Sequence, residues 1–261
     1  MKRSLLCGDI STLPQQFTEL VRDAIVYDSS CSPAARVFFI DKDGGFYLKK
    51  SAKGSLKTEA ELTSYFHGIG LGAEVLSYIS DENDWLLTRR ILGEDCTFKR
   101  YLNEPERLAA LLGETLRRLH ETSYEGCPVQ NRLEDYFALA EENYRTGNYD
   151  KSHFPDSFGF SSPEEAWSFA EEHRHLLSND TLIHGDCCLP NVMLDDFKFS
   201  GFIDLGNGGV GDRHIDLFWG LWSLGFNLKT DKYGDVFLDA YGRDAVSMDN
   251  LKIISAYEVF G

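Results

Sequence analysis

The chain reads His184-Gly185-Asp186-Cys187-Cys188-Leu189-Pro190-Asn191 and then, beyond a short hairpin, Ile203-Asp204-Leu205-Gly206. These two segments space an acid, an amide and a second acid as phosphoryl transfer requires. An Asp that accepts the proton of a substrate hydroxyl, followed by an Asn and an Asp that hold Mg²⁺, positions a nucleophile beside a metal-bound phosphate. We therefore predict Asp186 as the catalytic base, and Asn191 and Asp204 as metal ligands, of a kinase.

The residue types in this pattern fit the chemistry of magnesium. Mg²⁺ is a hard cation that takes one or two oxygen ligands from the protein and fills its shell with nucleotide phosphates and water. Asn191 offers a neutral carbonyl oxygen and Asp204 a charged one, while Asp186 stays free to deprotonate the acceptor. The alternative is a surface loop in which Asp and Asn only form turns. The apolar runs Thr181-Leu182-Ile183 and Val192-Met193-Leu194 favour the functional interpretation, because they predict buried segments on both sides.

Hydrophobic periodicity divides the chain into two parts. Strand patterns at 36–40, 46–50, 74–79 and 85–90 surround one helical pattern at 56–67. From residue 104 onward the pattern predicts helices, which we place at 104–120, 133–144, 163–177, 214–224, 233–241 and 249–260. We expect an α+β fold with a small β-rich N-terminal lobe, residues 1–92, that contains one main helix and binds nucleotide. A larger helical lobe, residues 93–261, would carry catalysis and substrate binding.

Charge and composition restrict the partners. The 42 acidic and 26 basic side chains give a formal charge of −16, which repels nucleic acid and anionic membranes and attracts small polycations. No apolar run approaches the ~18 residues of a membrane span, and the apolar stretch near Met1 is too short for a secretory signal. Six scattered cysteines without a Cys-x-x-Cys pair argue against zinc and against a disulfide scaffold. We expect a cytoplasmic enzyme with a small cationic substrate and no nucleic-acid or membrane partner.

At these residues the chain resembles the aminoglycoside phosphotransferases, most closely those that act on the 3′-hydroxyl. The resemblance rests on His184-Gly185-Asp186, where protein kinases have His-Arg-Asp, and on Phe199-Ser200-Gly201-Phe202-Ile203-Asp204-Leu205-Gly206. It continues with Gly211-Asp212-Arg213-His214-Ile215-Asp216 and Tyr257-Glu258-Val259-Phe260. The resemblance implies a bilobal, protein-kinase-like enzyme that uses ATP and Mg²⁺ to phosphorylate an aminoglycoside antibiotic and so confers resistance.

The resemblance also implies roles on the nucleotide side. The family's Tyr-Leu-Lys matches residues 47–49, which implies that Tyr47 stacks on the adenine and that Lys49 contacts the α- and β-phosphates; Lys50 remains an alternative. A helix glutamate should pair with the lysine, as in other kinases. We favour Glu59 over Glu61, because Glu59 shares a face of the predicted helix with its apolar residues.

Two further segments resemble nucleotide-binding parts of the family. Residues 29–34 resemble its Ser-Pro-Ala loop, which implies that Ser32 and the neighbouring amides reach the phosphates; a Ser-Pro turn without a ligand is the equal alternative. Residues 86–93 resemble the family's hinge. The match implies that the carbonyl of Arg89 and the amide of Ile91 bind the adenine.

The acceptor side matches less closely. An aminoglycoside presents ammonium groups that need carboxylates. Glu258 and Phe260 match the family's C-terminal Glu-x-Phe, in which the glutamate and the terminal carboxylate contact the drug. Here Gly261 follows, and one added residue moves that carboxylate by up to ~3.5 Å. The loop at 153–156 lies where relatives carry acidic substrate-binding residues, which makes Asp156 the local candidate.

Several residues depart from the family pattern. Asn207 stands where close relatives have arginine, and Trp222 and Phe226 stand where they carry charged residues. Together with Trp219 these aromatics recur at helical spacing, which we interpret as a core stripe; an aromatic wall of the acceptor pocket is the alternative. Two other functions therefore remain open: a kinase of another small hydroxylated amine or antibiotic, and a nucleotide-binding regulator without catalysis.

Overall fold

The computed structural model describes residues 3–6, 13–149 and 159–261. The chain forms two compact units, one made of residues 1–98 and 190–206 and the other of residues 99–189 and 207–261. Residues 190–206, which carry both predicted metal ligands, therefore belong to the same unit as the N-terminal strands. The functional division at residue 92 stays a prediction.

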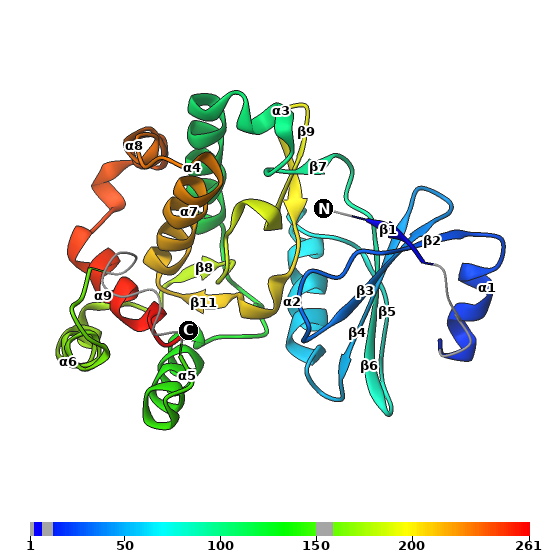
Figure 1. The fold of residues 1–261 in the computed structure, drawn as a ribbon, viewed down its shortest axis with the longest axis horizontal. Helices are drawn as coiled ribbons and strands as arrows, with labels where there is room; N and C mark the ends of the chain where they lie inside the picture. Colours follow the sequence, from blue (N-terminus) through cyan, green and yellow to red (C-terminus); the bar gives the residue numbers. More distant parts are fainter. Residues whose placement is uncertain (1–2, 7–12, 150–158) are drawn as a thin grey trace. The chain divides into compact units, whose positions relative to one another are not determined.

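An antiparallel sheet of six strands, in the order β1-β2-β3-β4-β6-β5, forms the centre of the first unit (Figure 1). Its strands are β1 (Ser4–Leu5), β2 (Ile25–Asp28), β3 (Arg36–Asp41), β4 (Phe46–Ala52), β5 (Val75–Ser80) and β6 (Asn83–Arg89). Alternation along β4 buries Phe46 and Leu48 in an apolar core with Trp85 and Leu87. The opposite face of β4 is therefore left to Tyr47 and Lys49.

Two helices and a second sheet complete this unit. The short helix α1 (Thr18–Val21) contributes to the apolar core. Helix α2 (Lys57–Gly68) packs on the other face of the sheet, where its Ala60 clusters with Leu86 of β6. A three-stranded antiparallel sheet joins β7 (Glu94–Asp95), β9 (Val192–Asp195) and β10 (Lys198–Phe202), with β9 in the middle. The β9–β10 hairpin returns the chain directly to Asp204.

The second unit is mainly helical. It contains α3 (Lys99–Leu102), α4 (Pro105–His120), α5 (Arg132–Thr146), α6 (Pro163–His173), α7 (Arg213–Leu228), α8 (Gly234–Tyr241) and α9 (Met248–Glu258). The strands β8 (Thr181–Ile183) and β11 (Gly209–Gly211) pair antiparallel beside them. Helix α4 packs closely on α8. The two backbones approach each other at Gly113, where an added Cβ would lie 2.3 Å from the carbonyl oxygen of Phe237.

Side-chain caps fix where several of these helices begin. Asn131, Ser162, Asp212 and Ser247 each accept a hydrogen bond from a backbone amide in the first turn of α5, α6, α7 and α9. Such caps satisfy amides that have no partner within the helix. In the part of the chain that the structure describes, no helix is both long and apolar enough to span a membrane.

The predicted elements are confirmed to within a few residues. The helix expected at 56–67 is α2, the helix expected at 104–120 is α4, and the four expected N-terminal strands are β3 to β6. The prediction missed β1, β2, β7 and β11, which are two to four residues long. Such short strands form because a neighbouring strand offers backbone partners, and their sequences carry too few residues for a period-two signal.

Candidate active site

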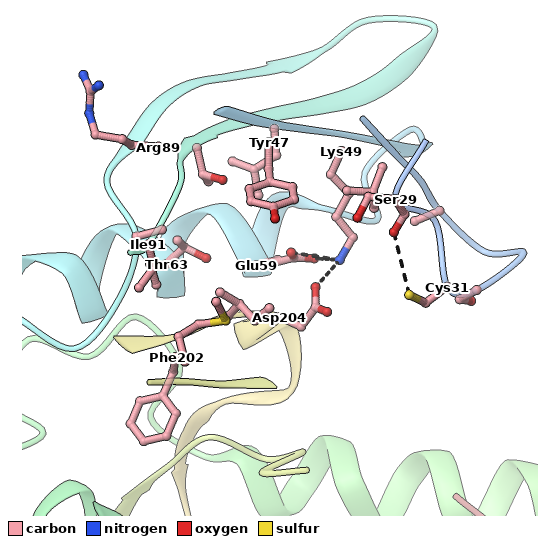
Figure 2. A pocket seen from close by; sticks show the side chains of 18 of the residues that line it. Ser29, Cys31, Tyr47, Lys49, Glu59, Thr63, Arg89, Ile91, Phe202 and Asp204 are labelled. Atoms are coloured by element: carbon pink, nitrogen blue, oxygen red, sulfur yellow. Dashed lines mark hydrogen bonds and ion pairs between the residues drawn. The ribbon is translucent and has the colours of Figure 1, made fainter. Parts of the chain in front are cut away.

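The first unit contains a cavity on the face of the sheet that carries Tyr47 and Lys49 (Figure 2). At its centre the ammonium group of Lys49 lies 2.8 and 2.9 Å from the two carboxylate oxygens of Glu59 and 2.9 Å from Oδ1 of Asp204. Burial by itself would lower the pKa of Lys49, but the charges of Asp204 and Glu59 outweigh burial and raise it. Lys49 is therefore a cation shared by two carboxylates.

The structure decides two choices that the sequence left open. Lys50 points away from the cavity, because its ammonium group lies 5.1 Å from the centre of the Trp85 ring, on the core face of the sheet. Glu61 forms an exposed helical pair with Lys57 at 3.8 Å. The ion pair between Lys49 and Glu59 is thus present as predicted, while its role in binding nucleotide stays a prediction.

The other predicted nucleotide-binding residues also line this cavity. Tyr47, Ser32, Arg89 and Ile91 border it. The hydroxyl oxygen of Ser32 accepts a hydrogen bond from the amide of Ala34 at 3.1 Å, so the loop forms a Ser-turn as well as a wall of the cavity. Other lining residues were not assigned a role from the sequence, although Ser29 and Phe202 belong to segments that carried the resemblance: Ser29, Thr63, Met193 and Phe202.

Asp204 and Asn191 occupy the β9–β10 segment of the same unit. Asp204 has a φ of 57°, a conformation that side chains other than Gly adopt at a cost and that often marks a functional site. Its carboxylate borders the cavity and is 53% exposed. The backbone of Asn191 is tied to this hairpin, because its carbonyl accepts a hydrogen bond from the amide of Ile203 at 3.0 Å. One ammonium group shared by two carboxylates leaves net negative charge, and the oxygen donors present fit a hard divalent cation.

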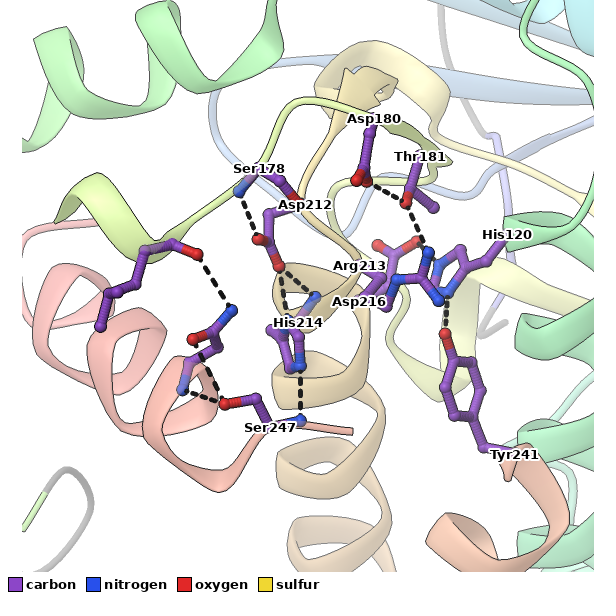
Figure 3. Close-up of polar contacts among 12 residues, drawn as sticks. His120, Ser178, Asp180, Thr181, Asp212, Arg213, His214, Asp216, Tyr241 and Ser247 are labelled. Atoms are coloured by element: carbon purple, nitrogen blue, oxygen red, sulfur yellow. Dashed lines mark hydrogen bonds and ion pairs between the residues drawn. The ribbon is translucent and has the colours of Figure 1, made fainter. Parts of the chain in front are cut away.

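In the second unit, the backbone that precedes Asp186 is held by one buried carboxylate. Asp216, at the start of α7, accepts hydrogen bonds from the amides of His184 and Gly185, each at 2.7 Å. The same carboxylate bonds the ring of His120 at 3.1 Å, and His120 contacts the hydroxyl of Tyr241 at 2.8 Å (Figure 3). Asp216 is fully buried. This network fixes the direction in which Asp186 leaves the strand β8.

Gly185 is required by the same geometry. Its φ is 83°, and a Cβ at this position would lie 1.8 Å from the carbonyl oxygen of Asn207. Both facts exclude a side chain. The glycine of the His-Gly-Asp motif therefore lets the loop that carries Asp186 approach the backbone of Asn207.

A second cavity, in the helical unit, is lined by Asp186 and Glu258. Glu258 is only 8% exposed, and its Oε1 accepts hydrogen bonds from the hydroxyl of Tyr136 at 2.9 Å and from Nε1 of Trp219 at 3.2 Å. Burial raises the pKa of Glu258 to about 7, and the charge of Asp186 adds to the shift, although both hydrogen bonds oppose it. This carboxyl group changes its charge near neutral pH.

Asn207, one of the departures from the family pattern, forms a hydrogen bond with Arg132 at this cavity. Its Oδ1 accepts a hydrogen bond from the guanidinium group of Arg132 at 3.0 Å, and both residues line the cavity. Burial lowers the pKa of Arg132, yet an arginine remains charged. The cavity therefore presents a cation beside its carboxylates, a feature that no local sequence pattern predicted.

Phe260 stays a predicted substrate residue; its side chain is fully buried among Tyr144 and Trp167, and Gly261 borders the cavity. The core stripe expected on α7 is wrong, because Trp222 and Phe226 are 37% and 56% exposed. The buried face of α7 points in another direction. The predicted substrate residue Asp156 lies outside the described residues.

Comparison with known proteins identifies the family. The profile described as the phosphotransferase enzyme family matches residues 30–251. A protein named a probable aminoglycoside 3′-phosphotransferase, from Lactococcus lactis, is 48% identical over 254 residues, which is 97% of this chain and 97% of that protein. The chain belongs to the aminoglycoside phosphotransferase family.

Solved structures of aminoglycoside phosphotransferases share this fold. An aminoglycoside-3′-phosphotransferase of type VIII matches with a TM-score of 0.75 and 26% identity, over 91% of this chain and 93% of that chain. A phosphotransferase from Streptomyces rimosus in complex with ADP and streptomycin matches with a TM-score of 0.71, over 86% of this chain and 90% of that chain. At 22% identity the second likeness shows the fold alone. The predicted family and the kinase-like α+β fold class are confirmed.

In this aminoglycoside phosphotransferase, several residues that the sequence did not assign to the site hold the predicted site residues in place through hydrogen bonds. Tyr136 and Trp219 hold Glu258, while Asp216 and His120 hold the loop of Asp186. Asp216 belonged to the segment that carried the resemblance, so a signal for it was present. Tyr136 and His120 lie on helices where they look like ordinary amphipathic positions, and only the tertiary contacts reveal them.

Proposed function

We propose that this phosphotransferase transfers the γ-phosphate of ATP to the 3′-hydroxyl of an aminoglycoside antibiotic and so confers resistance. The observation that carries the proposal is that Asp186 and Glu258 line one cavity. A base for a hydroxyl and a buried carboxylate for an ammonium group are the two recognition elements that a hydroxylated polyamine requires.

The donor side of the reaction belongs to the first unit. Lys49, oriented by Glu59, binds the α- and β-phosphates, and Ser32 with its neighbouring amides binds the phosphates from the opposite loop. Tyr47 stacks on the adenine, and the backbone of Arg89 and Ile91 reads it. This assignment is supported by the fact that all six residues line one cavity. A nucleotide phosphate donor also agrees with the phosphotransferase enzyme family that the chain matches.

Asn191 and Asp204 would hold Mg²⁺. When bound, Mg²⁺ neutralises charge on the phosphates during transfer. The residues support this role in their own right, because Asp204 presents a half-exposed carboxylate at the cavity while Lys49 balances only part of the local negative charge. Removing that carboxylate should weaken nucleotide binding more than it changes the fold.

On the acceptor side, Asp186 orients the hydroxyl and accepts its proton. Glu258, held by Tyr136 and Trp219, anchors an ammonium group of the substrate when it is ionised. Arg132 disfavours an ammonium group at its own side of the cavity and offers donors to hydroxyl oxygens. Asp156 remains a candidate for a second anchor.

The formal charge of −16 agrees with a cationic substrate and opposes nucleic-acid and membrane partners. We infer a cytoplasmic location, since ATP is available there. The non-catalytic alternative is disfavoured by the intact set of Asp186, Asn191, Asp204 and Lys49. A kinase of another small amine shares every step above and differs only in the acceptor.

A matched pair of substrates tests the acceptor and the position of transfer. Kanamycin B should be phosphorylated once, at the 3′-hydroxyl, in an ADP-release assay with mass spectrometry of the product. Tobramycin, which is kanamycin B without the 3′-hydroxyl, should bind competitively and remain unmodified at that carbon. The affinity for both should weaken as salt rises, because anchoring is electrostatic. Absence of binding and of turnover with aminoglycosides would transfer the assignment to another small amine.

Two variants separate the chemical step from donor binding. Asp186→Asn should bind Mg·ATP normally and lower turnover by ~10²-fold or more, because the proton acceptor is lost while the shape is kept. Asp204→Asn should weaken Mg·ATP binding, measured by calorimetry, because charge is removed from the metal site. Near-normal turnover in the first variant, or unchanged nucleotide affinity in the second, would contradict the assigned role.

A further inference from the structure

Helix α7 carries a continuous array of three aromatic side chains that begins in the acceptor cavity. Trp219 lines the cavity and donates its indole N–H to Glu258. The rings of Trp219 and Trp222 meet edge to face, with centroids 5.5 Å apart. Trp222 then stacks on Phe226 at 5.0 Å with an angle of 7° between the ring planes. The array therefore leads from Glu258 along one side of the helix to the surface.

The outer part of this array faces solvent although the same helix has a well-buried face. The buried residues of α7 are His214, Ile215, Asp216, Leu217, Gly220, Ser223 and Leu224. Trp222 and Phe226 are 37% and 56% exposed, so the core does not require their rings. Single exposed apolar side chains are common, but a stacked pair that adjoins a binding cavity extends the apolar surface on which a ligand can pack.

Lys229 restricts which part of the array a ligand can reach. Its ammonium group lies 4.1 Å from the centre of the Phe226 ring and places a positive charge at the outer end of the stack, which disfavours the ammonium groups of an acceptor there. Trp222 lies between this charged end and the cavity. It is therefore the ring that a molecule extending from the acceptor cavity would meet.

We propose that Trp222, supported by Phe226, binds an additional sugar ring of the acceptor, and that the sugar contacts the indole ring through its C–H groups. This inference rests on the proposed function and names a specificity-determining contact outside the cavity. The C–H groups of a sugar ring match the electron-rich face of an aromatic ring, and such contacts need no charge. The contact adds affinity for acceptors with more than two rings and leaves the chemistry at Asp186 unchanged.

Neamine and ribostamycin provide a probe that varies one ring without varying charge. Ribostamycin is neamine with an added ribose, so both carry the same ammonium groups. Wild-type protein should bind ribostamycin roughly 2- to 10-fold more tightly than neamine, the range expected for one aromatic contact. This ratio should persist between low and high salt, although both affinities fall, because only the shared ammonium contacts are screened.

Variants of the array identify the contact. Trp222→Ala should bring the ratio of the two affinities close to one and leave the neamine affinity unchanged, whereas Trp222→Phe should keep most of the ratio. Tyr124→Ala is the matched control, since Tyr124 is an aromatic residue of the same unit with 39% exposure and lies outside the array. Thermal unfolding of each variant verifies that the fold is retained. Kanamycin B, whose third ring is attached at another position of the same core, is measured in parallel.

The possible outcomes keep this inference distinct from the proposed function. The sugar contact is refuted, and the proposed function stands, if neamine is phosphorylated but Trp222→Ala leaves the affinities of ribostamycin and kanamycin B relative to neamine unchanged. The same conclusion follows if Trp222→Ala weakens the binding of neamine as much as that of the larger acceptors. If none of the three compounds binds or is phosphorylated, the proposed function fails and the sugar contact fails with it.

Discussion

Replacing Asp216 with Asn tests whether one buried carboxylate aims the catalytic loop. The two oxygens of Asp216 accept hydrogen bonds from the amides of His184 and Gly185 and from the ring of His120. An amide has only one acceptor oxygen. The least costly orientation keeps that oxygen on the side of His184 and His120 and turns the NH₂ group toward the amide of Gly185. One buried backbone N–H then loses its acceptor.

The stability change follows from that single loss. A hydrogen bond to a charged acceptor contributes about 1.5–3 kcal/mol, and an unsatisfied buried donor costs about 1–3 kcal/mol. The two values describe partly the same interaction and are not summed in full. We expect the unfolding free energy of the variant to fall by about 2–4 kcal/mol. At about 2–4 °C for each kcal/mol in a chain of this size, the unfolding midpoint should fall by about 5–15 °C. Differential scanning calorimetry measures this shift directly.

Activity should fall for a separate reason. The amide of Gly185 immediately precedes Asp186, so its release lets the catalytic carboxylate move relative to the acceptor hydroxyl. A displacement of about 1 Å can cost ~10²-fold in turnover. We expect kcat to fall by that order below the unfolding temperature, while KM for ATP is unchanged, because the cavity around Lys49 does not include this loop.

Asp212→Asn is the matched control for this experiment. Asp212 is equally buried and accepts hydrogen bonds from the amide and the ring of His214 and from the amide of Ser178, none of which belongs to the catalytic loop (Figure 3). It should lose similar stability and keep its kcat. Equal kcat losses in the two variants, or an unchanged midpoint in Asp216→Asn, would refute the reasoning.

Three further predictions follow from the two cavities. Lys49→Met should lower kcat/KM for ATP by ~10²-fold or more, whereas Lys50→Met, altered on the opposite face of the strand, should stay near wild type; similar losses in both would exclude the assignment. Because burial raises the pKa of Glu258 to about 7, KM for kanamycin should fall several-fold between pH 6 and pH 8 as the group ionises, and should fall less in Glu258→Gln. The pH dependence of folding stability has the opposite sign. Because the pKa of Glu258 is raised in the folded protein, its contribution to the unfolding free energy is fully present below the ordinary pKa of 4.5 and is lost as pH rises through about 7. Urea unfolding at several pH values can measure this loss. Gly185→Ala should lower the unfolding free energy by roughly 3 kcal/mol or more, because both its φ and the carbonyl of Asn207 exclude a Cβ; a wild-type midpoint would show that the loop can shift freely.

The sequence alone determined the elements whose signals are local. The spacing of Asp186, Asn191 and Asp204 predicted phosphoryl transfer because the chemistry constrains residue type and separation together. Strand alternation placed Lys49 opposite the core, and helical periodicity placed Glu59 on the inward face of α2. The family followed from the same residues, and the comparisons confirmed it.

Other features were decided only by the tertiary structure. Periodicity grouped Trp222 and Phe226 with the core because three aromatics at helical spacing look alike whether they face protein or solvent. Which side of α7 is buried depends on the elements that pack on it, and two of these, α4 and β8, lie far away in sequence. Phe260 likewise became a packing residue because α5 and α6 surround it.

The hydrogen-bond partners of the catalytic loop illustrate the same limit. Asp216 lies 31 and 32 residues from the two amides that it holds, and His120 lies 96 residues from Asp216. No local pattern encodes a contact at such separations, because a buried polar side chain is satisfied by whichever group the fold brings beside it. The sequence therefore predicted which residues carry the chemistry, and the packing of distant segments determined what holds those residues in place.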